Sequence, residues 1–155
     1  MKPVDSIVGE DAVETRLLQQ MAREARDFLN AQDWCARIDQ QFLAYGVGGV
    51  VAVFLTEITP DSIDVDRSLW VIVGDLPPAW IIADDSPTAA DALDAYCLEM
   101  ELWVEAVKCG KSVENLIPVN VAPTLKNAEQ LGGRLVFLRS EILPRARAES
   151  GREVG

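Results

Sequence analysis

The feature that most constrains the fold is the stretch of residues 68–108, in which two apolar runs flank a turn with two prolines and an amphipathic pattern follows. The runs cover residues 68–73 and 79–83, and the turn between them reads Gly-Asp-Leu-Pro-Pro. Because proline donates no backbone hydrogen bond, Pro77 and Pro78 belong in the turn or at the first position of an edge strand. We therefore expect a β-hairpin whose second strand lies at an edge of a sheet.

A helix is expected directly after this hairpin. Thr88, followed by Asp91 three residues later, resembles a capping box, and acidic residues near a helix N-terminus interact favourably with the helix dipole. Apolar residues then recur with the 3.6-residue period of a helix until Gly110, a residue type that commonly ends helices. The hairpin and this helix together can close most of a hydrophobic core.

The preceding segments predict one helix and two strands. Residues 10–30 have the spacing of an amphipathic surface helix, and residues 37–45 alternate weakly between apolar and polar. Residues 50–55 are rich in β-branched and aromatic residues, which is typical of a strand. The glycine-rich segment 46–49 predicts a hairpin turn or bulge between the strands, because its spacing matches no phosphate-binding motif.

The last expected helix covers residues 124–143 and ends before Pro144. With it, the sequence predicts an α+β fold in the order α-β-β-β-β-α-α, in which the helices cover one face of a mainly antiparallel four-stranded sheet. A single domain is expected over residues 10–143, with a flexible arm at residues 1–9 and a disordered tail at residues 144–155.

Acidic residues are concentrated in the middle of the chain. The net charge is −11, and eleven acids but one base, Arg67, lie between Glu57 and Glu101. Such a region repels phosphate backbones and anionic lipids, so it argues against nucleic-acid and membrane partners and suits either solubility or a basic protein partner. The candidate partner-binding residues within it are Asp61, Asp64, Asp66, Asp84, Asp85, Asp91 and Asp94.

Residue types that carry catalysis or bind metals are sparse. The chain contains no histidine, no Cys-x-x-Cys and no Gly-x-Ser-x-Gly, which excludes the designs that depend on them. The acids at positions 61, 64 and 66 miss the spacing of an EF-hand calcium loop. We therefore expect a non-enzymatic protein without metal or cofactor. The remaining alternative is an enzyme that uses a carboxylate pair, such as Asp66 with Asp84 or Asp85.

The sequence predicts a cytoplasmic protein. No apolar run reaches the length of about 18 residues that a membrane-spanning helix needs, and the N-terminal residues soon turn acidic instead of following the pattern of a signal peptide. The three cysteines, Cys35, Cys97 and Cys109, are odd in number and scattered. We expect them to be unpaired small apolar residues and not a disulfide framework.

The chain also resembles a known family. The segment LWVIVGDLPPAW, followed by DDSPTAADALDAYCLEMELWVEAV, resembles an uncharacterised family of small bacterial cytoplasmic proteins, and AYGVGGVVAVFL fits the same likeness. The resemblance covers residues 34–143 and implies no activity or site residues, because the family has none assigned. A four-stranded meander backed by helices in a small acidic protein is also similar to immunity proteins, which neutralise bacterial toxins.

Three functions follow from the sequence, in order of preference. The first is a protein-binding module of immunity or inhibitory type, whose acidic face meets a basic protein partner. The second is a structural or assembly subunit, either monomeric or homodimeric through an edge strand at residues 79–83. The third is the carboxylate-dependent enzyme.

Overall fold

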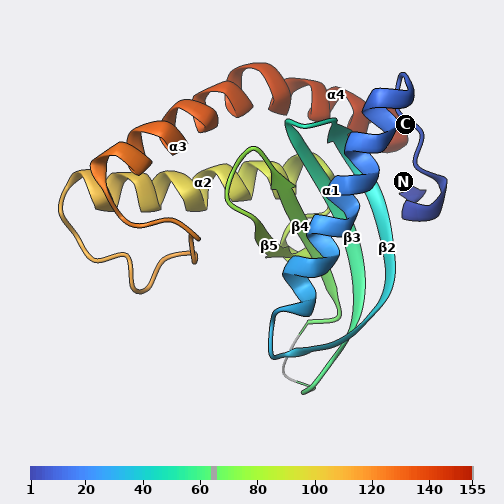
Figure 1. Ribbon diagram of the computed structural model, residues 1–155, viewed down its shortest axis with the longest axis horizontal. Coiled ribbons are helices and arrows are strands. Elements are labelled where there is room, and N and C mark those ends of the chain that lie inside the picture. Colours follow the sequence, from blue (N-terminus) through green and yellow to red (C-terminus); the bar gives the residue numbers. More distant parts are fainter. Residues whose placement is uncertain (64–65, 155) are drawn as a thin grey trace.

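The computed structural model describes residues 1–63 and 66–154, and for residues 151–154 the backbone alone. Within these residues, five antiparallel strands form one sheet in the order β1-β2-β3-β4-β5 (Figure 1). The strands are β1 (Lys2–Pro3), β2 (Cys35–Val47), β3 (Val51–Pro60), β4 (Ser68–Gly74) and β5 (Ala79–Ile82). The expected α+β class and antiparallel sheet are confirmed. The prediction of four strands is wrong by one, because the short strand β1 adds to the edge of β2.

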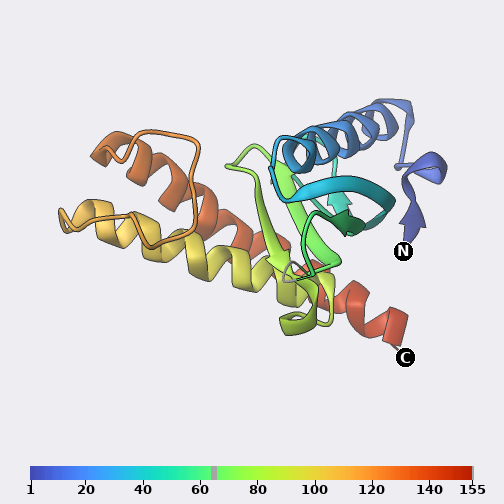
Figure 2. The ribbon, with the colours of Figure 1, turned by 90° about the horizontal axis from the view of Figure 1, so that it is seen from below.

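Helices lie on both faces of this sheet (Figure 2). α1 packs on one face and α2 on the other, while the C-terminal helices pack on α2. The main helices are α1 (Ala12–Asn30), α2 (Ala89–Lys108), α3 (Leu125–Phe137) and α4 (Leu143–Val154). The prediction that the helices cover one face is therefore wrong. The reason is that β3 is buried on both sides, since Val53 faces α2 and the neighbouring Phe54 faces α1.

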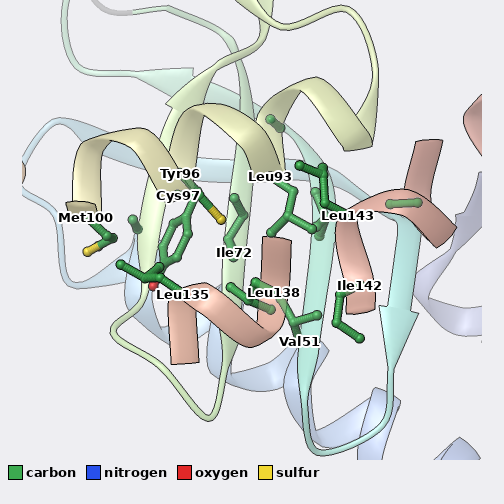
Figure 3. Close-up of a cluster of buried hydrophobic side chains, with 14 of the residues drawn as sticks. Val51, Ile72, Leu93, Tyr96, Cys97, Met100, Leu135, Leu138, Ile142 and Leu143 are labelled. Atoms are coloured by element: carbon green, nitrogen blue, oxygen red, sulfur yellow. The ribbon is translucent and has the colours of Figure 1, made fainter. Parts of the chain in front are cut away.

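The larger hydrophobic cluster lies between the sheet, α2 and the C-terminal helices (Figure 3). Tyr96 and Met100 of α2 are fully buried there between Ile72 of β4 and Leu135 of α3. The smaller cluster joins α1 to the other face of the sheet and includes Leu29. Burying a side chain of that size contributes about 1.5–3 kcal/mol to stability.

The predicted start and end of α2 are confirmed. The hydroxyl oxygen of Thr88 accepts a hydrogen bond from the backbone N–H of Asp91 at 3.1 Å, and the hydroxyl donates to the Asp91 carboxylate at 2.9 Å. The helix ends at Lys108, and Gly110 adopts a positive φ of 69°. Because a glycine has no Cβ, it takes this left-handed conformation without strain.

The chain continues as a helix beyond its predicted C-terminal end. A π-helical turn, η3 (Leu138–Ile142), links α3 to α4, so the prediction of a disordered tail over residues 144–155 is wrong for the described part of that segment. Pro144 is the second residue of α4, directly after the π turn, and its missing N–H removes one backbone donor from this continuous helical run. Ala146 is buried, which anchors α4 on the core.

The N-terminal residues also differ from the expected flexible arm. β1 pairs with Phe42 and Leu43 of β2, and a 3₁₀ turn, η1 (Val4–Ser6), follows. Ile7 is buried in the cluster under α1. The apolar contacts of this segment therefore hold it on the sheet.

Candidate functional site

One end of the sheet carries two acidic segments that are distant in the sequence. In the antiparallel sheet the end of β3, the start of β4 and the end of β5 lie side by side, because Glu57 pairs with Ser68 and Leu69 pairs with Ile82. Residues 61–63 and 66–67, between β3 and β4, and the 3₁₀ turn η2 (Ala83–Asp85) after β5 therefore flank this end of the sheet. Both segments contain predicted site residues.

We call this surface the acidic end and define it by Asp61, Asp66, Asp84 and Asp85. Asp66 is partly exposed and the other three are exposed. None of the four carboxylates forms a hydrogen bond or ion pair with any residue that the structure describes. Their negative charge is therefore available to attract cations. The remaining predicted acid of this loop, Asp64, lies outside the described residues.

A neighbouring acid, Asp39, is matched within the molecule. It accepts hydrogen bonds from the Thr59 hydroxyl at 2.7 Å and from Arg37 Nε at 2.6 Å, and these two contacts lower its pKa. A carboxylate such as that of Asp39, which already accepts a hydrogen bond and pairs with a cation, attracts a partner less strongly than the unmatched carboxylates of the acidic end.

The two remaining predicted site residues lie elsewhere and have internal partners. Asp94 on α2 contacts Arg139 at 2.9 Å and Arg147 at 3.1 Å, and Asp91 contacts Arg147 at 3.4 Å. These ion pairs join Arg139 of η3 and Arg147 of α4 to α2. The sequence had grouped Asp91 and Asp94 with the other acids, whereas the fold pairs their charge with arginines of the C-terminal helices.

A groove of about 660 Å³ runs along the open edge of β5, next to the acidic end. The outer parts of α2 and α3 extend past this edge, and the connection between them, residues 109–124, lies beyond it (Figures 1 and 2). Residues 115–120 of that connection form the outer wall of the groove. Its volume falls in the range of about 300–1,000 Å³ that is usual for binding pockets.

The groove combines apolar walls with acidic charge. Phe28 of α1 and Trp80 of β5 line one side, and Leu116, Ile117 and Val119 line the outer wall. The charged side chains among its described lining residues are Asp85 and Glu99, so the lining contains two acids and no lysine or arginine. A ligand that fits this surface carries apolar groups together with positive charge.

Two buried hydrogen bonds fix the segments at both ends of β5. The hydroxyl of Tyr96 donates to the carbonyl oxygen of Pro77 at 2.6 Å, just before the strand. Trp70 Nε1 donates to the carbonyl oxygen of Ser86 at 2.7 Å, just after it. The edge strand is therefore held in place before any ligand arrives, which lowers the entropic cost of binding.

The sequence did not reveal the outer wall of this groove. Residues 112–121 read as a short turn and an extended linker, because Pro118 interrupts any regular pattern. The signal that could have identified it is the presence of three apolar residues, Leu116, Ile117 and Val119, in a segment without secondary structure. In the fold they are partly buried against the larger hydrophobic cluster.

Thiol and metal chemistry have little support in the described residues. Burial raises the pKa of the Cys97 thiol to about 11, and a hydrogen bond to Glu105 raises the pKa of the exposed Cys109. Both shifts disfavour the thiolate, which is the nucleophilic form. Across residues 1–63 and 66–150, no three side chains of the metal-binding types lie together in a way that could hold an ion.

In the described part of the chain, no helix is both long and apolar enough to cross a bilayer. Comparison with protein-family models, with curated proteins and with solved structures gives no match for this chain.

Proposed function

We propose that the protein is a non-enzymatic binding module, of immunity or inhibitory type, that engages a basic protein partner through the acidic end and the adjoining groove. The observation that carries this proposal is that Asp85, one of the four unmatched carboxylates of the acidic end, lines an apolar groove whose described lining contains acids and no base. Complementary charge steers the encounter and selects the partner, whereas burial of apolar surface supplies affinity.

The compartment that we assign to this interaction is the cytoplasm. Its support is the state of the cysteines, since Cys35, Cys97 and Cys109 are all free. Free thiols are typical of a reducing compartment.

A homodimer joined through β5 is the second candidate, and the position of this strand at the edge of the sheet favours it. Charge opposes it. Two copies that meet at β5 bring Asp85 and Glu99 of both chains into one interface, and each chain carries a net charge of −11. Like charges without counterions destabilise such an interface. Sedimentation at low and high salt separates the two candidates. Salt screens the repulsion between like charges, so a homodimer of this kind should form more readily as salt rises, whereas a monomer should stay a monomer.

The test is affinity capture from the native host with three immobilised forms of the protein. The first is the wild type, and the second reverses the acidic end with Asp61→Lys, Asp66→Lys, Asp84→Lys and Asp85→Lys. The third carries four matched reversals at exposed acids elsewhere, Asp5→Lys, Glu114→Lys, Glu129→Lys and Glu141→Lys. Circular dichroism and urea unfolding first establish that all three forms are folded.

We expect a basic protein that binds the wild type and the matched control but not the acidic-end variant. Its affinity should fall as salt rises, because the contact is electrostatic. Equal capture by the acidic-end variant contradicts the proposal, and so does a partner of acidic composition.

A further inference from the structure

The outer edge of β5 offers a row of unused backbone groups. β5 pairs with β4 on one side, and on its other side the N–H and C=O groups of residues 79–82 make no hydrogen bond with any described residue. The groove opens along this side. Unpaired groups at a sheet edge are a template for pairing with another extended chain.

The two faces of β5 differ in chemistry. Trp80 and Ile82 point to the face covered by α1, and Ala79 and Ile81 point to the face covered by α2. Side chains of a strand added next to β5 alternate in the same way. Every second side chain of the added strand therefore meets the α1 side of the groove, and the others meet the α2 side.

The α1 side selects apolar side chains. It presents Phe28 beside Trp80, and the ring of Trp80 packs edge-on against Trp34 with the ring centroids 5.1 Å apart. The α2 side selects cationic side chains, because it presents Glu99 of α2 and because Asp85 lies at the junction between β5 and α2. A segment that alternates apolar and basic residues complements both sides.

We infer that an extended segment of the basic partner, with apolar residues alternating with lysine or arginine, adds as a strand to the outer edge of β5. This inference rests on the proposed function and specifies how the partner is recognised. The four residues of β5 span about 13 Å at the usual rise of a strand, so a segment of four to six residues fills the edge.

A second copy of this chain fits the same edge less well. Residues 115–120 line the groove on its outer side, so the sheet of another molecule would meet this segment as well as the edge of β5. The matching acids of two copies would also repel each other. The occupant is therefore a cationic segment of a different protein.

The test uses the fluorescein-labelled peptide acetyl-Val-Lys-Val-Lys-Val-Lys-amide at low salt, with binding followed by fluorescence anisotropy. The peptide acetyl-Val-Glu-Val-Glu-Val-Glu-amide is the charge control. Two further peptides keep the lysine sequence but carry backbone N-methyl groups on the valines alone or on the lysines alone. In a strand, the N–H groups of alternate residues point to the same edge, so each N-methyl isomer blocks one edge and leaves the other intact.

We expect the lysine peptide to bind and the glutamate peptide not to bind. One N-methyl isomer should bind about tenfold more weakly or worse, because it loses the hydrogen bonds to β5, while the other isomer stays within a few-fold of the parent. The protein variant Asp85→Asn/Glu99→Gln should weaken the parent peptide by a similar factor. The matched variant Glu114→Gln/Glu129→Gln, at exposed acids outside the groove, should not.

Equal binding of both N-methyl isomers overturns strand addition, because attraction by charge alone does not distinguish them. Failure of the lysine peptide to bind overturns it too, and so does a dimer at micromolar concentration in sedimentation. If a basic partner is captured through the acidic end while the isomers bind equally, strand addition fails and the proposed function stands. If the isomers differ as expected but no basic partner is captured, the edge binds cationic strands and the proposed function fails.

Discussion

The guanidinium of Arg139 donates two hydrogen bonds to the carboxylate of Glu101, from Nε to Oε2 at 2.6 Å and from Nη2 to Oε1 at 2.7 Å. Its Nη1 also donates to Asp94 at 2.9 Å. The two hydrogen bonds to Glu101, more than the one to Asp94, raise the pKa of Arg139. One side chain thus ties the π turn η3 to α2 across 38 residues of sequence.

Arg139→Met should lower the free energy of unfolding by about 1–2 kcal/mol. Forked contacts of this kind are strong, but the Arg139 side chain is 34% exposed and solvent screens the pair, so the expected loss lies between that of a surface pair and that of a buried one. Urea unfolding measures the loss, which should shrink at high salt. A double-mutant cycle with Glu101→Gln is the control, and purely additive effects would show that the two residues do not interact.

Tyr96→Phe should destabilise the protein by about 1–3 kcal/mol. The substitution removes the hydroxyl that donates to the buried carbonyl oxygen of Pro77 and leaves that oxygen unsatisfied. Tyr45→Phe is the matched control, because the Tyr45 hydroxyl makes no hydrogen bond with any described residue, and its effect should be small. Urea unfolding compares the two variants. Equal losses would mean that the Pro77 contact does not stabilise the turn before β5.

Thr56→Val should stabilise the protein by about 1 kcal/mol. The Thr56 hydroxyl lies in β3 with 1% of the residue exposed, and it has no hydrogen-bond partner among the described residues. A methyl group of similar size removes the cost of burying that hydroxyl. Thr56→Ser keeps the hydroxyl and loses a buried methyl group, so it should instead destabilise by about 1 kcal/mol. A Thr56→Val variant that unfolds at lower urea concentration than the wild type contradicts this account.

The three thiols should differ in their reaction with iodoacetamide at pH 8. Cys109 is exposed and should react first, whereas Cys35 and Cys97 are buried and should react only on unfolding. Glu105→Gln should speed the reaction of Cys109, because the Glu105 carboxylate accepts the thiol hydrogen bond at 3.2 Å and raises the thiol pKa. Intact-mass spectrometry counts the labels with time. As the pH rises above the raised pKa of Cys109, the difference between the wild type and this variant should vanish.

Local signals in the sequence predicted much of the fold. Thr88 and Gly110 marked the bounds of α2 because capping and positive φ depend on neighbouring residues alone. The two apolar runs on either side of Pro77 and Pro78 marked the hairpin and its edge strand, because the effect of proline on a strand is also local. What could not be predicted depends on distant packing. The pairing of β1 with β2 joins residues about 40 positions apart, and no pattern in two residues encodes it.

The candidate site was also predictable only in part. Asp84 and Asp85 were recognised from composition, but their position at the same end of the sheet as Asp61 and Asp66 follows from the register of β3, β4 and β5. The pairing of Asp94 with Arg139 spans 45 residues, so the sequence offered no means of separating matched acids from unmatched ones. The charge of the chain predicts that a partner is basic, whereas the fold determines which acids are left without an internal partner and can bind it.

The most direct test of the central claim is amide hydrogen exchange of the protein in complex with the basic partner that it captures. Because strand pairing protects N–H groups, residues 79–86 should exchange more slowly in the complex, together with residues 115–120 of the groove wall. The exposed side of α3 around Val136, which lies outside the groove, should exchange at an unchanged rate. Protection at α3 with none at residues 79–86 would contradict the assignment of the acidic end and the edge groove as the binding surface.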